Sequence, residues 1–393
     1  MVPNQKTTAL DSFVDQSAPI CYGILKPGEH VSDGIPVIKV KNIIGGRIIE
    51  GDLLRTSPKI HNQYKRAEVK QGDLLLTIRG TTGRVAIVPS SLAGANITQD
   101  TARIRVSSDD EPMYVFYALQ SPDVQRQIDL NTVGQAVKGI NIAEVRKLRI
   151  FHPIGIEQKK IAKILSTWDK AITTTEQLLA NSQQQKKALM QQLLTGKKRL
   201  LDIKTGVIFE RDFKTLSLRD VCSMQAGKFI NASDILNGHQ DGTYPCFGGN
   251  GLRGYTKTFT HDGEFSLIGR QGALCGNITF ATGCFHATEH AVVVTPRSNI
   301  NTKWLYYALV DLNLNQYATG VAQPGLSVKN IEQVSIKVPE SINEQQKIAA
   351  VLSTADQEIT TLKQKLDALK QEKKALMQQL LTGKRRVKVE AAA

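Results

Sequence analysis

The stretch EQKKIAKILSTWDKAITTTEQLLANSQQQKKALMQQLLTGKKRL at residues 157–200 recurs as EQQKIAAVLSTADQEITTLKQKLDALKQEKKALMQQLLTGKRRV at residues 344–387, with 28 identities in 44 positions. The twelve letters KKALMQQLLTGK are the same in both copies. A repeat of this kind determines the architecture more strongly than a single motif, because the same unit must be built twice. The chain therefore predicts a globular half followed by a long helix, and then the same plan again.

Both copies have the apolar spacing of a long helix that packs against another helix. In the second copy, apolar residues recur at intervals of four and three, which is typical of a coiled-coil seam. Lys186 and Lys373 occupy matching seam positions. A polar residue there either sets the helix register or marks a place where the helices part or meet another subunit.

The ends of these helices are also marked in the sequence. Glu157 and Glu344 suit the positive N-terminal end of a helix, and Gly196 and Gly383, each followed by Lys or Arg, predict where the helices stop. About 39 residues give a helix roughly 58 Å long. The nearest partner for each seam is the other copy, so we expect an antiparallel coiled coil with an internal pseudo-twofold repeat.

The remaining residues form two globular segments that share little sequence until their ends. TVGQAVKGINIAEVRKLRIFHP in the first half aligns there with ATGVAQPGLSVKNIEQVSIKVP in the second. Alternating runs such as DLLLTIRG and HAVVVTP predict strands, and helices are expected near residues 112–119 and 302–310. The predicted fold class is α+β, with two mixed α/β domains joined by two long helices. The expected divisions are 1–155, 156–200, 201–341 and 342–388.

Composition favours an acidic partner in solution. The 393 residues carry a formal net charge of +14, and no apolar run approaches the ~18 residues that cross a bilayer. The N-terminus lacks the basic-then-apolar pattern of a secretion signal, so we expect a cytoplasmic protein that does not enter a membrane. Nucleic acid is the first candidate partner. The alternative is a basic surface that meets an acidic protein or has no such partner.

The sequence does not offer a recognisable catalytic or metal site. It has no phosphate-binding G-x-x-x-x-G-K-[ST] loop, no dinucleotide-binding G-x-G-x-x-G and no H-E-x-x-H. Cys275, Cys284, His286 and His290 are close in sequence, but their spacing matches no common zinc site, so no metal is expected. The acidic run at residues 109–111 is expected to be solvated.

Glycine-rich loops carry the side chains that read nucleic-acid bases. Arg pairs with guanine and Asn or Gln with adenine, while glycine lets the backbone approach a phosphate. Each loop alone favours a water-facing turn over a base reader, but together, on a basic chain, the loops favour DNA binding. The candidate DNA-binding residues are Arg79, Thr81, Thr82, Arg84, Gln99, Thr101 and Lys138 in the first half, and Asn250, Arg253, Tyr255, Arg270, Gln271, Asn277, His290 and Gln323 in the second.

The chain resembles the specificity subunit of type I restriction-modification systems over its whole length. The resemblance rests on the paired helix beginnings IAKILSTWDKAI and IAAVLSTADQEI, the shared ending KKALMQQLLTGK, and loop text such as YKRAEVKQGDLLLTIRGTTGRVAIVP and LIGRQGALCGN. The approach to the second helix is one residue longer, P-x(4)-EQ against P-x(3)-EQ. The repeated helices are specific to the family, whereas the loop text does not identify the bases read.

The resemblance implies a non-catalytic subunit with two target-recognition domains and two spacer helices. It implies binding to a bipartite, asymmetric target in double-stranded DNA, with two modification subunits that methylate adenine and two restriction subunits that cleave DNA. S-adenosylmethionine, ATP and Mg²⁺ are expected in those partners, and no cofactor in this chain. The helix residues expected to bind partners are Leu165, Trp168, Lys186, Leu189, Leu193, Leu352, Lys373, Leu376 and Leu380.

Two alternatives remain open from the sequence. A structural coiled-coil adaptor would bind DNA without sequence preference, and its affinity would fall steeply with salt. A self-contained methyltransferase or nuclease with an unrecognised site would bind S-adenosylmethionine by itself.

Overall fold

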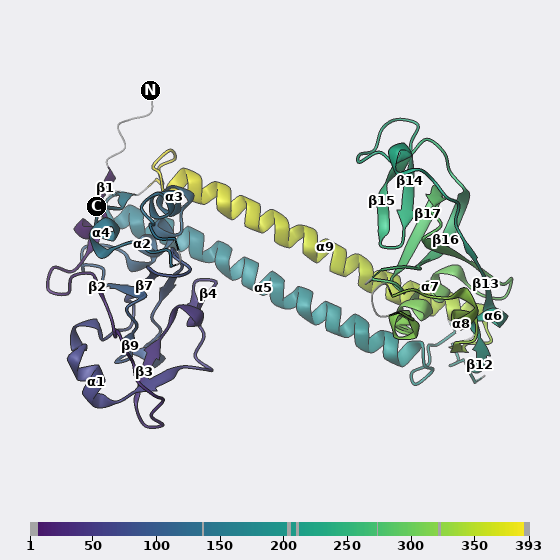
Figure 1. The fold of residues 1–393 in the computed structure, drawn as a ribbon, viewed down its shortest axis with the longest axis horizontal. Coiled ribbons are helices and arrows are strands. Elements are labelled where there is room, and N and C mark those ends of the chain that lie inside the picture. Colours follow the sequence, from purple (N-terminus) through teal and green to yellow (C-terminus); the bar gives the residue numbers. More distant parts are fainter. Residues whose placement is uncertain are drawn as a thin grey trace. The chain divides into compact units, whose positions relative to one another are not determined.

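The computed structural model describes residues 7–135, 137–202, 206–209, 212–272, 274–320 and 324–388. The chain divides into two compact units (Figure 1). The first unit comprises Met1–Thr175 with Lys365–Ala393, and the second comprises Glu176–Gln364. Each unit thus contains one globular part and a section of both long helices, so the compact units cut across the four segments expected from the sequence.

The two long helices are present where the repeat predicts them. Helix α5 covers Gly155–Leu193 and α9 covers Ile342–Leu380, each with 39 residues. Glu157 and Glu344 lie in the first turns. Gly196 and Gly383, just past the helix ends, have φ of +74° and +72°, the left-handed conformation that favours glycine at a helix end.

The described residues in the globular part of the first unit form short strands and four α-helices. The central sheet has the order β2-β10-β7-β8, and β6-β3-β9, β1-β11 and β4-β5 form smaller sheets. The strands are β1 (Thr7–Ala9), β2 (Cys21–Tyr22), β3 (Ile35–Ile38), β4 (Ile43–Ile44), β5 (Arg47–Ile48), β6 (Leu54–Thr56), β7 (Leu74–Thr77), β8 (Val85–Ile87), β9 (Asn96–Ile97), β10 (Thr101–Ile104) and β11 (Arg149–Phe151). The helices are α1 (Pro58–Gln63), α2 (Pro112–Leu119), α3 (Pro122–Leu130) and α4 (Ile142–Lys147).

The described residues of the second unit form a larger sheet and a separate two-stranded sheet. Six strands follow the order β13-β18-β16-β17-β14-β15, and β12 pairs with β19. The strands are β12 (Lys214–Ser217), β13 (Cys222–Ala226), β14 (Tyr244–Gly248), β15 (Gly251–Thr256), β16 (His261–Gly269), β17 (Ile278–Ala287), β18 (Ala291–Pro296) and β19 (Ser335–Val338). The helices are α6 (Leu218–Val221), α7 (Thr302–Asp311) and α8 (Val328–Glu332).

Helices α2 and α7 confirm the helices expected near residues 112–119 and 302–310. Both are apolar over most of their length, and each is buried in the core of its own unit. Glu111 caps α2 by accepting the Met113 N–H, with Pro112 at the first helical position. In α7 the Asn301 side chain accepts the Trp304 N–H in the same way.

Within each unit, the local sections of α5 and α9 run in opposite directions. In the first unit Asp169 of α5 contacts Lys373, while Glu157, twelve residues earlier, contacts Arg386 beyond the end of α9. In the second unit Lys186 contacts Asp356 and Arg199 contacts Glu344. In each unit, contacts at higher residue numbers of α5 involve lower residue numbers of α9, so the two helix sections are antiparallel there.

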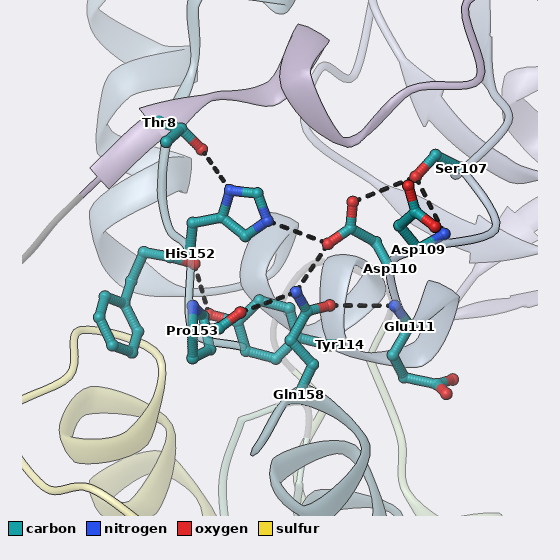
Figure 2. A network of polar contacts seen from close by, with 10 residues as sticks. Thr8, Ser107, Asp109, Asp110, Glu111, Tyr114, His152, Pro153 and Gln158 are labelled. Carbon is teal, nitrogen blue, oxygen red and sulfur yellow. Dashed lines mark hydrogen bonds and ion pairs between the residues drawn. The ribbon is translucent and has the colours of Figure 1, made fainter. Parts of the chain in front are cut away.

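A polar network fixes the first globular part to the start of α5 (Figure 2). Asp110 accepts the Gln158 Nε2–H at 2.7 Å and lies 3.0 Å from His152 Nε2, while Gln158 Oε1 accepts the Glu111 N–H. The Tyr114 hydroxyl donates to the Phe151 carbonyl at 2.6 Å. The expectation that the acidic run at 109–111 is solvated is wrong for Asp110, whose side chain is only 6% exposed, because it closes this network.

Candidate nucleic-acid interface

Backbone hydrogen bonds tie the loop after β7 to two distant segments of the chain. The Ile78 N–H donates to the Asp100 carbonyl at 2.8 Å, and the Gly80 N–H donates to Lys138 at 2.9 Å. The Ile140 N–H donates back to Ile78 at 2.9 Å. Because the backbone carries these bonds, the side chains of this loop are free to differ.

The loop after β16 in the second unit is held in the same way. The Arg270 N–H donates to the His290 carbonyl, the Gly272 N–H to Pro324, and the Leu326 N–H to Arg270, each at 2.9 Å. These bonds match those of the first unit one for one. They therefore align the loop at residues 78–84 with the loop at 270–277, whose sequences share only two glycines.

The strand ends complete this alignment. The Thr77 N–H donates to the Arg84 carbonyl at 2.9 Å, and in the second unit the Gly269 N–H donates to Asn277 at the same distance. Position by position, Arg79 corresponds to Gln271 and Arg84 to Asn277. The two units thus present one local framework with different polar side chains. The sequence signal for this equivalence is weak. Each loop begins with a polar residue followed by glycine and ends with glycine followed by a polar residue, and the second loop is one residue longer.

Several candidate residues of the first unit lie together at this loop. Arg79 is exposed, and its Nη1 lies 3.3 Å from Gln99 Oε1. Lys138 is exposed on the segment that pairs with the loop. Arg84 is exposed and donates from Nη1 to the Ile43 carbonyl at 3.2 Å.

The threonines among the candidates behave differently from one another. Thr81 is exposed and Thr82 is half-buried. Thr101 is fully buried in β10, so the prediction that it contacts DNA is wrong. The reason is the pairing of β10 with β7 inside the central sheet, which places Thr101 opposite Thr77.

The second unit gathers four candidates around one depression of about 610 Å³. Asn250, Arg253, Gln271 and His290 line it, together with the glycines of the β14–β15 turn. A methyl group added at Gly269 would lie 1.9 Å from the Gly249 carbonyl oxygen, so this close approach requires glycine. The GGNG sequence of the turn is the signal that could have identified these lining glycines.

The other candidates of the second unit lie outside this lining. Arg270 and Asn277 are exposed, and Tyr255 is half-buried with its ring edge-on to His239 at 5.3 Å. Of the four lining side chains, His290 is engaged with Glu289 at 3.1 Å. Gln323 lies outside the described residues.

The seam leucines expected to bind partners are core residues of this chain. Leu165 and Leu380 are buried in the core of the first unit, and Leu193 and Leu352 in that of the second. These four predictions are wrong for direct contact with another subunit, since the globular parts already cover the helix ends. Trp168, Leu189 and Leu376 are half-buried.

The two seam lysines lie in equivalent polar clusters. Lys373 pairs with Asp169, which also accepts the Tyr117 hydroxyl at 2.6 Å. In the second unit, Lys186 pairs with Asp356, which accepts the Tyr307 hydroxyl at 2.8 Å. Burial, with the bond to the aspartate, raises the pKa of both tyrosines. Both tyrosines therefore remain hydrogen-bond donors at neutral pH.

The described part of the chain shows neither a metal cluster nor a membrane span. No group of three or more His, Cys, Asp or Glu side chains is placed to hold a metal ion among the described residues. None of the described helices combines the length and the apolar character that a bilayer crossing requires.

A family model described as the type I restriction modification DNA specificity domain matches residues 26–181 and 210–371. Among curated proteins, the chain is 49% identical over 148 residues to the EcoprrI specificity subunit and 32% identical over 157 residues to the EcoBI specificity subunit, both from Escherichia coli. These matches cover 37% and 40% of this chain, but only 37% and 33% of the two relatives. The MjaVIII specificity subunit of Methanocaldococcus jannaschii is 24% identical over 360 residues, covering 82% of this chain and 81% of its own length.

Solved structures match the fold over nearly the whole chain. The S subunit of a type I restriction-modification system from M. genitalium aligns with a TM-score of 0.64 at 17% identity, covering 96% of this chain and 97% of its own. The HsdS subunit from Thermoanaerobacter tengcongensis aligns with a TM-score of 0.50 at 18% identity, covering 97% and 98%.

Proposed function

The chain belongs to the type I restriction modification DNA specificity family, and from that premise we propose that its two units read the two unlike parts of a bipartite DNA target. The observation that carries this proposal is the duplicated loop framework. The same backbone bonds hold Arg79 in one unit and Gln271 in the other. Arg pairs with guanine and Gln with adenine, so equal frameworks with unlike side chains suit half-sites of unlike sequence.

The charge around the loops supports DNA rather than a neutral ligand. Beside the proposed readers Arg79 and Arg253, Arg84 and Lys138 are exposed in the first unit and Arg270 is exposed in the second. Positive side chains near base-reading groups contact phosphates and orient a protein on the duplex. Polar readers that differ between the units then supply the sequence information.

In this proposal the long helices form an antiparallel coiled coil that relates the units by a pseudo-twofold axis. Two reading modules on a spacer of about 58 Å can reach half-sites spaced about one helical turn apart, roughly 34 Å. The target is then asymmetric, with an unread gap between its parts.

The partners of the chain follow from the same proposal. Two modification subunits with S-adenosylmethionine, and two restriction subunits with ATP and Mg²⁺, assemble with this non-catalytic chain in the cytoplasm. Because the seam leucines are covered within the chain, the docking surface uses the outward faces of α5 and α9. Trp168, Leu189 and Leu376 are half-buried and so remain partly accessible to such a partner.

The decisive experiment maps the methylated sequence in cells that carry this chain with its modification subunit. Arg79→Ala is expected to relax one half of the methylated motif and leave the other unchanged, and Arg253→Ala to do the reverse. A lost bidentate base contact costs about 1–3 kcal/mol at that position. Lys147→Ala, on the exposed end of α4 and outside the loops, is the matched control and leaves the motif intact.

A structural adaptor that binds DNA without sequence preference predicts a different result. All three variants would then leave the methylated motif unchanged, and Arg79→Ala and Arg253→Ala would only weaken binding in a salt-dependent way. A motif that changes in one half alone excludes that function.

A further inference from the structure

A basic concavity of about 440 Å³ lies on the first unit, and the loop at residues 78–84 contributes nothing to its described lining. It is formed between the segment leading into β2, the turn after α1, β10 and α4. The cations that line it are Lys65, Arg66, Lys70, Arg103, Arg105 and Arg146. Glu68 is the acidic residue among the described lining residues.

Half of these cations are already paired. Arg105 donates from Nε and Nη2 to the two carboxylate oxygens of Asp73 at 2.8 and 2.7 Å. Lys65 pairs with Glu68, and Arg146 Nε lies 3.7 Å from Asp11. The other three, Arg66, Lys70 and Arg103, form no ion pair with the described residues, so the concavity keeps a positive charge.

Arg103 is the most unusual of the six. Only 2% of it is exposed, and its Nη2 donates to the Pro19 carbonyl at 2.9 Å and to the Ala18 carbonyl at 3.3 Å. Its Nε is buried and has no hydrogen-bond partner. A buried guanidinium without an anion is unfavourable, and a bound anion at the concavity would relieve that cost.

The fold itself does not require a cation at this place. Arg103 lies between Cys21 of β2 and Leu75 of β7 in the sheet, and Val293 occupies the same register between β13 and β16 in the second unit. The helix that follows differs as well, since Glu332 ends α8 where Arg146 lies in α4. The basic concavity is therefore specific to the first unit.

We propose that this concavity is a phosphate-binding site. Arginine presents several N–H groups in a plane, which matches the oxygen geometry of a phosphate group, and the exposed Arg66 and Lys70 supply charge at the rim. The phosphate comes either from the DNA backbone or from a free phosphate compound. The Asp100 carbonyl accepts the Ile78 N–H and so holds the loop at residues 78–84. Arg103 lies three residues after Asp100, about 10 Å along an extended strand. This distance is comparable with the ~12 Å width of the major groove, so a duplex read by the loop could also bring a backbone phosphate to the concavity.

The first arm of the test titrates the purified full-length chain with inorganic phosphate at constant ionic strength and measures the heat of binding. Arg66→Gln and Lys70→Gln are each expected to weaken phosphate binding at least about fivefold. Both side chains are exposed, so neither change endangers the fold. Lys59→Gln, an exposed lysine of α1 outside the concavity, is the matched control and binds phosphate as the unaltered chain does.

Arg103→Met adds a second measurement with the same probe. It is expected to abolish phosphate binding while circular dichroism retains the native spectrum. The site is refuted if the unaltered chain binds no phosphate, or if Lys59→Gln weakens binding as much as Lys70→Gln does.

The second arm distinguishes the two sources by the salt dependence of binding to a DNA duplex. If the occupant is a backbone phosphate, Lys70→Gln lowers the slope of log affinity against log salt by about one and affects all sequences equally. If the slope is unchanged while phosphate binding falls, the occupant is a free phosphate compound. Both results uphold the site. Failure of the proposed reading function is seen separately, as an unaltered chain without sequence preference.

Discussion

Removal of Arg199 is expected to destabilise the start of α9 more than removal of Arg386 destabilises the start of α5. Arg199 donates to both carboxylate oxygens of Glu344 at 2.7 and 2.9 Å, and the two side chains are 17% and 2% exposed. Arg386 makes the equivalent contact with Glu157, but its own side chain is 62% exposed while Glu157 is 2% exposed. The two ion pairs have the same chemistry and differ in their access to water.

This difference sets the size of the effect. Breaking a buried pair by removing one partner costs about 3–5 kcal/mol, because an unpaired buried charge remains. The positive end of the helix still stabilises the carboxylate by up to about 1 kcal/mol, so Arg199→Ala is expected to cost about 2–4 kcal/mol. After Arg386→Ala, water replaces the exposed guanidinium and the Val387 N–H still donates at 3.2 Å. The expected loss there is about 1–2 kcal/mol.

Native-state hydrogen exchange measures this locally and does not require the two units to unfold together. The amides of the second turns, residues 346–349 in α9 and 159–162 in α5, report the two sites. Lys198→Ala and Arg385→Ala, at the exposed neighbours of the two arginines, are the matched controls and should change little.

Two results would contradict this reasoning. Equal losses for Arg199→Ala and Arg386→Ala would show that burial of the arginine does not matter. An effect of Lys198→Ala as large as that of Arg199→Ala would show that general charge, rather than the pair, stabilises the helix start. Adding Glu344→Gln to Arg199→Ala should recover part of the loss, since it removes the unpaired charge.

Four further outcomes follow from single contacts. The Arg386 hydrogen bond lowers the pKa of Glu157, so its contribution is full above about pH 4.5 and is lost as the pH falls further, a loss that hydrogen exchange should show only while Arg386 is present. Gly383→Ala places a Cβ 2.7 Å from Cζ of Phe151 and keeps the left-handed backbone conformation that alanine disfavours. It should reduce the free energy of unfolding by about 2 kcal/mol or more and lower the thermal midpoint. Tyr117→Phe removes a 2.6 Å hydrogen bond to a carboxylate and should cost about 1–2 kcal/mol in urea unfolding. Thr101→Val, at a buried hydroxyl without a partner, should leave the methylated motif unchanged and not lower stability.

The helical part of this fold could be predicted from local pattern alone. The repeat, its four-three apolar spacing and the glycines at 196 and 383 fix the place of α5 and α9. These patterns can be recognised in the sequence because residues three and four positions apart lie on the same face of a helix. Helices α2 and α7 were predicted for the same reason.

The candidate site was only partly predictable, because burial depends on residues far apart in the sequence. Arg79 and Thr101 are both polar residues in glycine-rich text, yet one is exposed and the other lies inside a sheet. Leu165 and Leu380 have the pattern of a helix seam, but the globular part of their own unit covers them. The sequence marks which residues are suited to binding, and long-range packing decides which of them reach the surface.

The amino-acid sequence by itself determined that the protein is a duplicated pair of globular parts and long helices, since repetition and periodicity are properties of the linear chain. The tertiary structure alone revealed that the loops after β7 and β16 are one framework. Their equivalence lies in backbone hydrogen bonds to residues 20–62 positions away, and backbone bonds place no demand on side-chain identity. For the same reason, only the folded chain brought Arg103 together with Arg66 and Lys70 in one concavity.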